Sequence, residues 1–255
     1  MKNAKWNRLG LILAVCVGFA GPSLNAEEQN LAQVYFITAK KGHEAELYGK
    51  IKEHAEWRKE AGDPWAWSVY QTVTGSELGK YIIRSGNHGW SCWDAYEAFN
   101  AKGSAEWNEH VAPHVESTTA LIMEDAGIDD WPTEPDSANL IDVYWYDLKP
   151  GKMGEFFEAA EMYHQAIQEN DYDTHYTFAK TVSGGPSSRV VLALPFANYA
   201  AMEGPEEDLG EFFSRVMDEE DLVTANEKWI GSIDYTEGYI IRFHPELSVL
   251  PDPEE

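Results

Sequence analysis

The stretch that decides the fold is NLAQVYFITAKKGHEAEL, Asn30–Leu47, because a close relative of it returns as NLIDVYWYDLKPGKMGEF, Asn139–Phe156. Both copies open with Asn-Leu, continue through Val and aromatic residues, and turn at a glycine. The offset between them is 139 − 30 = 109 positions, and the same offset aligns Thr72-Val73 with Thr181-Val182. A duplicated unit of about 110 residues is the economical explanation.

Hydrophobic periodicity and turn residues predict the same order of elements in both copies. In the first copy we expect a strand at Ala32–Thr38, a helix at Gly42–Ala61, strands at Trp65–Val73 and Lys80–Ser85, helical segments over Ser91–Glu124 and a weak strand at Gly127–Trp131. In the second copy the matching segments are Ile141–Leu148, Gly151–Glu169, Tyr176–Val182, Arg189–Leu194, Asn198–Lys228 and Thr236–Leu247. Strand, helix, two strands, helix, strand is the ferredoxin-like order.

The first strand of each copy is apolar on both faces. Val34 and Phe36 alternate with Tyr35 and Ile37, whereas a solvated sheet face would carry polar residues at every second position. We therefore expect an α+β protein in which two ferredoxin-like units, residues 27–128 and 139–255, pack their sheets face to face as a single-chain barrel. The acidic, proline-bearing segment 129–138 is predicted to link them.

The first 26 residues have the layout of a secretory signal peptide. Three basic residues precede the apolar run Leu9–Ala20, and a small residue, Ala26, precedes the acidic Glu27. This predicts export to the periplasm or beyond. The sequence does not define whether Cys16 is lipidated, but the bulky Val15 before it does not fit a lipobox.

The composition is strongly acidic, with 19 Lys and Arg against 44 Asp and Glu and a net charge of −25. Nucleic acids and anionic membranes need a cationic surface, so neither is an expected partner. Cys92 is the one cysteine beyond the leader, which excludes an internal disulfide. The 44% of hydrophobic residues suffices for a packed core.

With this order of elements, and with the aromatic-rich segment WSCWDAYEAFNAKGSAEWNEH at Trp90–His110, the chain resembles the dimeric α+β barrel superfamily fused in tandem. Its members include NIPSNAP-like, antibiotic-biosynthesis-monooxygenase-like and EthD-like proteins. The resemblance implies the barrel fold. It implies no single activity, because the superfamily contains haem-degrading oxygenases, cyclases, isomerases, peroxidases and proteins without known chemistry.

His54 is the first candidate for catalysis. It shares the predicted sheet-facing side of a helix with Leu47 and Ile51, and the offset of 109 pairs it with Tyr163. A His and a Tyr at symmetric positions are expected to serve as an acid–base pair on a ligand between sheet and helix. The competing interpretation is a core histidine whose ring nitrogens are hydrogen-bonded.

His110 is the alternative catalytic candidate. It stands four residues before His114, but Pro113 between them would break a helix and spoil that spacing for a metal or haem site. In haem-degrading relatives a late-helix histidine ligates iron close to a tryptophan. His110 with Trp90 or Trp93 is the arrangement in this chain that resembles such a site.

Tryptophans concentrate in the first unit, so a pocket for an aromatic or cyclic ligand is expected there. The ligand-binding candidates are Trp67, His88, Trp90 and Trp93; ordinary core packing is the alternative. No phosphate-binding loop, GxSxG, HExxH or CxxC pattern is present, and we predict no metal site.

Three functions remain open from the residues. The first is an exported small-molecule-binding barrel, with or without His/Tyr acid–base chemistry on an aromatic or cyclic ligand. The second is a non-catalytic scaffold or partner-binding protein. The third is a haem-binding monooxygenase-like protein. The sequence leaves the cofactor undefined, and the internal pairing of two units predicts a monomer.

Overall fold

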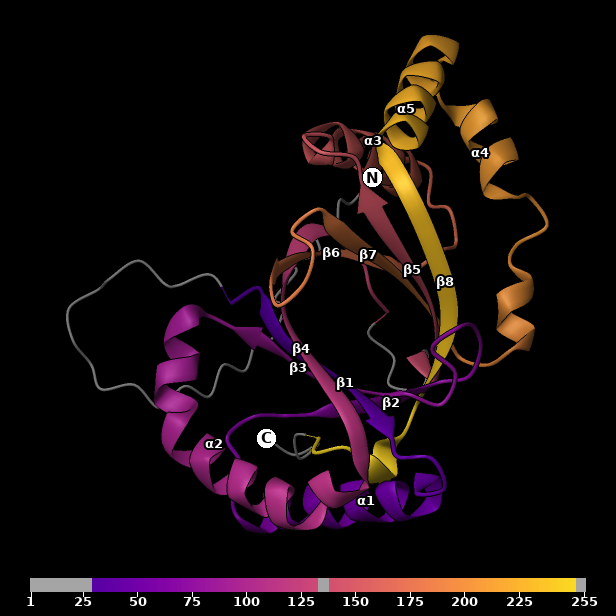
Figure 1. Ribbon diagram of the computed structural model, residues 1–255. Coiled ribbons are helices and arrows are strands. Elements are labelled where there is room, and N and C mark those ends of the chain that lie inside the picture. Colours follow the sequence, from indigo (N-terminus) through magenta and orange to yellow (C-terminus); the bar gives the residue numbers. More distant parts are fainter. Residues whose placement is uncertain (1–28, 133–137, 251–255) are drawn as a thin grey trace, which may run out of the picture.

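A computed structural model describes residues 29–132 and 138–250 (Figure 1). The first half comprises β1 (Leu31–Ala39), α1 (Glu44–Glu60), β2 (Ser68–Thr72), β3 (Tyr81–His88), α2 (Trp90–His110), the 3-10 turn η1 (Ala112–His114) and β4 (Val115–Asp130). The second comprises β5 (Leu140–Leu148), α3 (Met153–Glu169), β6 (Tyr176–Ser183), β7 (Arg189–Phe196), η3 (Ala200–Glu203), α4 (Leu209–Val216), α5 (Glu219–Ser232), β8 (Ile233–Phe243) and η4 (Pro245–Leu247). The expected signal peptide, Cys16 and the centre of the expected linker, 133–137, lie outside the described residues.

The eight strands form one closed barrel in the order β1-β3-β2-β8-β5-β7-β6-β4. Each half supplies a four-stranded antiparallel sheet, and two junctions seal the halves together. β4 pairs with β6, with Met123 opposite Thr181, and β2 pairs with β8, with Gln71 opposite Arg242. The predicted tandem ferredoxin-like barrel is confirmed, and closure leaves the sheet no free edge.

The inner faces of both sheets share one core. Val34 and Ile82 of the first half pack there with Val143 and Ile241 of the second, and Phe36 and Trp145 lie in contact, with ring centroids 6.0 Å apart. The alternate residues of β1, Tyr35 and Ile37, face outward and pack beneath the helices of the first half. Both faces of the strands are thus buried, as their sequence predicts.

The helices lie outside the barrel in two layers. In Figure 1, α1 and α2 cover the sheet of the first half, and α3, α4 and α5 gather at the opposite end over the sheet of the second half. Within the part of the chain that the structure describes, no helix has the length and apolar character needed to cross a membrane.

The prediction of helix up to Glu124 was wrong. α2 ends at His110, Pro113 lies in η1, and β4 begins at Val115. Proline cannot donate the backbone hydrogen bond of a helix, and Thr118 and Thr119 are β-branched residues that pair with Ile37 and Phe36 of β1. The weak strand expected at Gly127–Trp131 is the end of β4.

The helical region of the second half is divided more finely than expected. Asn198–Lys228 comprises η3, α4 and most of α5, with Gly204 at φ 72° where η3 ends. β8 begins earlier than predicted and ends at Phe243, because η4 turns the chain at Pro245.

Candidate functional site

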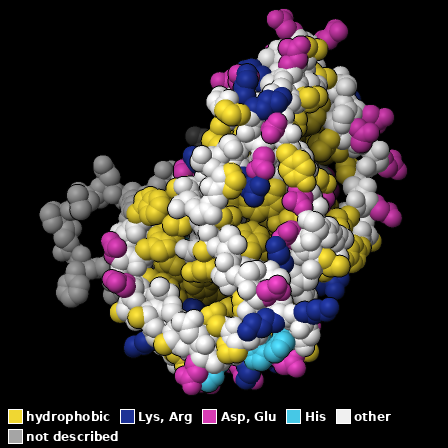
Figure 2. Space-filling model, viewed as in Figure 1, with side chains coloured by type: hydrophobic (Ala, Val, Ile, Leu, Met, Phe, Trp, Pro, Cys, Tyr) yellow, Lys and Arg dark blue, Asp and Glu magenta, His cyan; other side chains and the backbone are white. Residues whose placement is uncertain are grey.

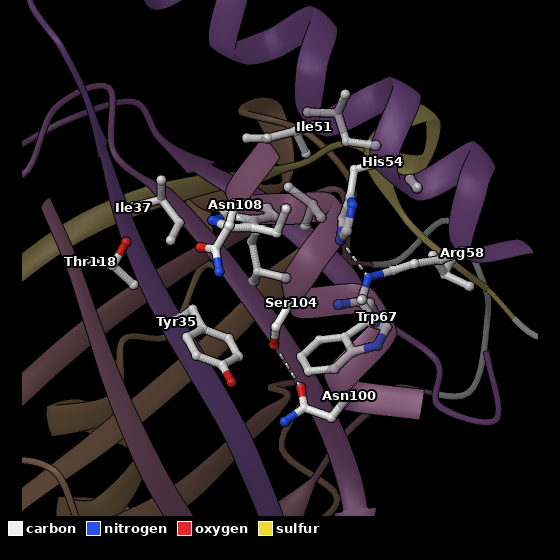
Figure 3. Close-up of a pocket in the computed structure, with 17 residues that line it drawn as sticks. Tyr35, Ile37, Ile51, His54, Arg58, Trp67, Asn100, Ser104, Asn108 and Thr118 are labelled. Atoms are coloured by element: carbon white, nitrogen blue, oxygen red, sulfur yellow. Dashed lines mark hydrogen bonds between the residues drawn. The ribbon is translucent and has the colours of Figure 1, made fainter. Parts of the chain in front are cut away.

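A cavity of about 360 Å³ lies in the first half, between the outer face of the sheet and helices α1 and α2. Figure 2 shows a hollow with hydrophobic side chains on this side of the molecule, and Figure 3 shows the side chains that line the cavity. Its size falls within the range of small-molecule sites, about 300–1,000 Å³. The cavity lies in the half of the chain in which the sequence predicted a pocket.

The sheet gives the cavity an apolar wall. Tyr35 and Ile37 extend from β1, Val69 and Ile83 come from β2 and β3, and Trp67 directly precedes β2. The ring centroids of Tyr35 and Trp67 lie 6.0 Å apart, with the ring planes at 37°. Flat rings and branched aliphatic side chains favour a ligand with a planar apolar body.

Helix α2 gives the cavity a polar rim. Asn100, Ser104 and Asn108 follow one another at four-residue spacing, so they share one face of the helix. All three are exposed, and the Ser104 hydroxyl donates to Oδ1 of Asn100 at 3.4 Å (Figure 3). The rim offers uncharged donors and acceptors at the mouth of the cavity.

The far end of the chain completes the cavity. Leu247 and Val249 line it, although they follow β8 of the second half. Trp67 and Val249 exchange two backbone hydrogen bonds, at 2.7 and 2.8 Å, and Val69 N–H donates to the hydroxyl of Ser248 at 2.9 Å. This C-terminal strap, residues 247–249, is buried and fixed to the start of β2.

His54 lies on the α1 wall with both ring nitrogens engaged. Arg58 Nε–H donates to Nε2 at 2.7 Å, and Nδ1 contacts the carboxylate of Glu106 on α2. The ring stacks on Trp57 and meets the edge of Trp107. Burial, together with the charge of Arg58, lowers the pKa of His54 despite the opposing effect of Glu106. The imidazole is therefore held neutral.

Arg58 connects His54 to a fully buried carboxylate. Its Nη1 donates to Asp63, whose side chain is 0% exposed, and to the hydroxyl oxygen of Tyr96 at 2.7 Å. Asp63 also accepts from the Tyr96 hydroxyl at 3.1 Å and from Trp67 Nε1 at 3.1 Å. The guanidinium lies over the Trp67 ring, 5.1 Å from its centroid. Glu106, His54, Arg58 and Asp63 thus form one continuous chain along the cavity, which we call the polar chain.

The second half packs its helices onto its sheet through rings, among them Phe212 and Phe213 of α4. Phe212 is fully buried, and the ring of Phe213 packs 4.6 Å from that of Tyr163. Trp229 of α5 adds a further ring, stacked on Phe156 at 4.4 Å. Gly103 and Ser104 are small residues of α2 on the cavity wall, whereas the second half packs large rings between its helices and its sheet.

Of the residues predicted from sequence, His54 and Trp67 line the cavity. Tyr163 does not join His54. It lies on α3 of the second half and donates its hydroxyl to Asn226 of α5 at 3.1 Å. The symmetric positions of the two residues separate them, because α1, which carries His54, and α3, which carries Tyr163, lie at opposite ends of the barrel (Figure 1).

His88 and two of the predicted tryptophans form a neighbouring cluster outside the cavity. His88 stacks on Trp65 at 3.8 Å and shares a hydrogen bond of 2.8 Å with Ser85. Burial, with the charge of Arg84, lowers the pKa of His88 to about 4. Trp93 meets the edge of the Trp65 ring, and Trp90 is half-exposed beside it.

His110 lies at the last residue of α2 with its side chain 49% exposed, and it is not among the cavity-lining residues. His114, in η1, has its Nδ1 3.1 Å from Nδ1 of His43. His110 and His114, whose spacing Pro113 was expected to spoil, thus have different neighbours. Within 29–132 and 138–250, no group of three or more His, Cys, Asp or Glu side chains is arranged to hold a metal ion.

Sequence reasoning missed Arg58, Asp63 and Glu106 as site residues. A signal for Arg58 was present, since it follows His54 by four residues and so shares its helix face. Asp63 and Glu106 join the site only through tertiary structure, and no local pattern marks them.

Comparison with solved structures identifies proteins of similar fold. A candidate monooxygenase from Lactobacillus acidophilus NCFM has a TM-score of 0.54 at 8% identity, over 88% of this chain and 100% of that one. A candidate monooxygenase from Fusobacterium nucleatum has a TM-score of 0.54 at 13% identity, over 85% of this chain and 93% of that one. An anthrone oxidase-like protein has a TM-score of 0.52 at 12% identity, over 87% of this chain and 94% of that one.

These neighbours are dimeric α+β barrel proteins, and the fold of this chain is the same. Identities this low establish the fold alone. No protein-family model matches the chain, and a search of curated proteins also finds no match.

Proposed function

We propose that this chain is an exported small-molecule-binding protein that takes a neutral, planar ring compound into the cavity of its first half. The observation that carries the proposal is the difference between the halves. The second half packs its helices onto its sheet through phenyl and indole rings, and the first keeps a cavity of about 360 Å³ between its helices and its sheet.

The lining defines the ligand. Tyr35, Trp67 and Trp107 offer ring surfaces to a flat apolar body, and the rim of α2 offers uncharged hydrogen-bonding groups to its polar edge. The polar chain carries two carboxylates, Asp63 and Glu106, against the single charge of Arg58, because His54 is neutral. An anionic ligand would lose its hydration and meet this excess of negative charge.

The finer family assignment and the location follow as parts of the same proposal. Among the three related families, the candidate monooxygenases and the anthrone oxidase-like protein support an antibiotic-biosynthesis-monooxygenase-like relationship over a NIPSNAP-like or EthD-like one.

Export rests on the basic and apolar pattern of residues 1–26. The internal pairing of the two halves supports a monomer.

The residues do not fit a haem ligated by either candidate histidine in this cavity. An axial ligand needs a free imidazole nitrogen. His54 has both nitrogens engaged, and His110 is not on the cavity wall. We expect haemin mixed with the purified protein to show no His110-dependent change in its Soret band.

The same contacts favour binding over histidine catalysis. A base on the cavity wall needs an acceptor nitrogen within reach of the ligand. Arg58 already donates a hydrogen bond to the acceptor nitrogen of His54, so the imidazole ring has a structural role in the cavity wall.

The test is a titration of the protein with fluorene and fluorenone, two neutral planar compounds, followed by quenching of tryptophan fluorescence. Trp67 and Trp107 line the cavity and report on its contents. Ser104→Phe places a ring on the rim of the cavity and should abolish quenching, because the added ring blocks the mouth. Ala105→Phe adds the same ring one residue on, away from the lining residues, and should leave quenching intact. The proposal would be refuted if neither compound quenched the fluorescence in a saturable way. It would also be refuted if Ser104→Phe and Ala105→Phe showed equal quenching.

A further inference from the structure

Arg58 retains hydrogen-bonding capacity that the fold does not use. A guanidinium has five N–H groups. Nε–H donates to His54, and the two N–H groups of Nη1 serve Asp63 and Tyr96. Nη2 has no hydrogen-bond partner among the described residues, which leaves two donors of a charged group on a residue that lines the cavity.

Gly103 leaves this donor uncovered. A Cβ atom at Gly103 would lie 3.1 Å from Nη2 of Arg58 and 3.4 Å from its Cζ. Gly103 is buried in the middle of α2 and lines the cavity, so the missing side chain opens the edge of the guanidinium. In the second half the position of Arg58 is apolar, since the offset of 109 between α1 and α3 places Ile167 there.

The guanidinium is held in place before any ligand arrives. Asp63 and Tyr96 fix one edge, His54 fixes Nε, and the Trp67 ring lies beneath at 5.1 Å. In Figure 3 the side chain reaches from α1 toward His54 and Trp67. A donor fixed in this way binds a ligand with little loss of side-chain freedom.

The surrounding charges select the kind of acceptor. Asp63 pairs with Arg58, and the carboxylate of Glu106 adds a further negative charge at the other side of the neutral His54. An anionic ligand would meet this excess of negative charge. A carbonyl-type oxygen accepts the same hydrogen bond without that repulsion.

We propose that Arg58 is the ligand anchor of the cavity: its Nη2 donates to the carbonyl oxygen of a neutral ring compound, and Gly103 is the residue that admits that oxygen. This inference rests on the proposed binding function and adds the chemical group by which the ligand is recognised.

The experiment compares fluorenone with fluorene, which share one ring skeleton and differ by a carbonyl in place of a methylene. The dissociation constant of each is measured by tryptophan quenching on the full chain and on Gly103→Ala. Alanine is the better helix former, which favours a folded variant, and its methyl group covers Nη2 once the guanidinium shifts by a few tenths of an ångström. Gly49→Ala makes the same change in α1, where nothing lies within 4 Å of the added carbon.

We expect the unaltered chain and Gly49→Ala to bind fluorenone at least about tenfold more tightly than fluorene, as a hydrogen bond to a charged donor implies. In Gly103→Ala the two constants should agree within about twofold. Equal binding of both compounds by the unaltered chain would overturn the anchor and leave the binding function standing. So would a preference that survives in Gly103→Ala. Binding of neither compound would remove both proposals.

Discussion

Arg58 fixes the tautomer of His54. Its Nε–H lies 2.7 Å from Nε2 of the imidazole, measured between the nitrogens, and because an arginine nitrogen only donates, Nε2 must be the acceptor. The ring proton therefore resides on Nδ1, where it faces the carboxylate of Glu106. The hydrogen bond from Arg58 thus sets the direction of the hydrogen bond between His54 and Glu106.

This arrangement predicts the protonation state of His54. Nitrogen NMR of the folded protein should show a neutral ring with its proton on Nδ1, and this form should persist below pH 6.5 because the pKa of His54 is lowered. In urea the same ring should titrate near 6.5, the ordinary histidine value. A ring protonated on Nε2 at neutral pH would contradict donation from Arg58 to that nitrogen.

Asp63→Asn should destabilise the protein strongly. The side chain of Asp63 is fully buried and accepts from Arg58, Tyr96 and Trp67. Removing its charge leaves the guanidinium uncompensated, and breaking a buried pair in this way costs about 3–5 kcal/mol of the free energy of unfolding. Urea unfolding measures the loss. Glu77→Gln, which breaks the more exposed pair with Lys80, should change it by less than about 1 kcal/mol.

Acid should destabilise the fold through His88. The pKa of its buried ring is about 4 in the folded state against an ordinary 6.5, so between these values the unfolded chain binds the proton and the folded chain does not. Stability should accordingly be retained above pH 6.5 and fall as the pH drops toward 4, by roughly 1 kcal/mol per pH unit from this group.

His88→Gln should flatten that part of the pH profile in urea unfolding at a series of pH values. His110→Gln, at a half-exposed position, serves as the matched control and should leave the profile unchanged. An identical slope in the unaltered chain and His88→Gln would show that other groups account for the acid sensitivity.

Ser248→Ala should loosen the C-terminal strap. The Ser248 hydroxyl accepts from the backbone N–H of Val69 at 2.9 Å and donates to the carbonyl of His244 at 2.8 Å. Alanine leaves the buried N–H of Val69 without its partner, which costs about 1–3 kcal/mol. Hydrogen exchange should then accelerate at Val69 and Trp67. Unchanged protection at both amides would mean that the strap is held by other contacts.

The repeat allowed the barrel to be predicted because it fixes the strand order and the apolar faces. The prediction failed where the copies diverge, as in β4, whose acidic and threonine-rich start has no clear strand pattern in the sequence. The pairing of Thr118 and Thr119 with β1 overrides the helical interpretation.

The site was predicted only in part. The spacing of α1 placed His54 toward the sheet, and the tryptophans indicated the first half. The cavity itself depends on how α2 lies against the sheet, since Gly103 and Ser104 on its wall are small residues without a local signal in the sequence. Asp63 and the strap enter through contacts between residues far apart in the chain, which no local pattern contains.

The strap also sets the order in which the site can mature during synthesis. Ser248 and Val69 are 179 positions apart, so the sheet wall of the cavity leaves the ribosome long before the segment that closes it. The cavity of the first half therefore lacks the segment that closes it until the ribosome has translated the whole of the second half.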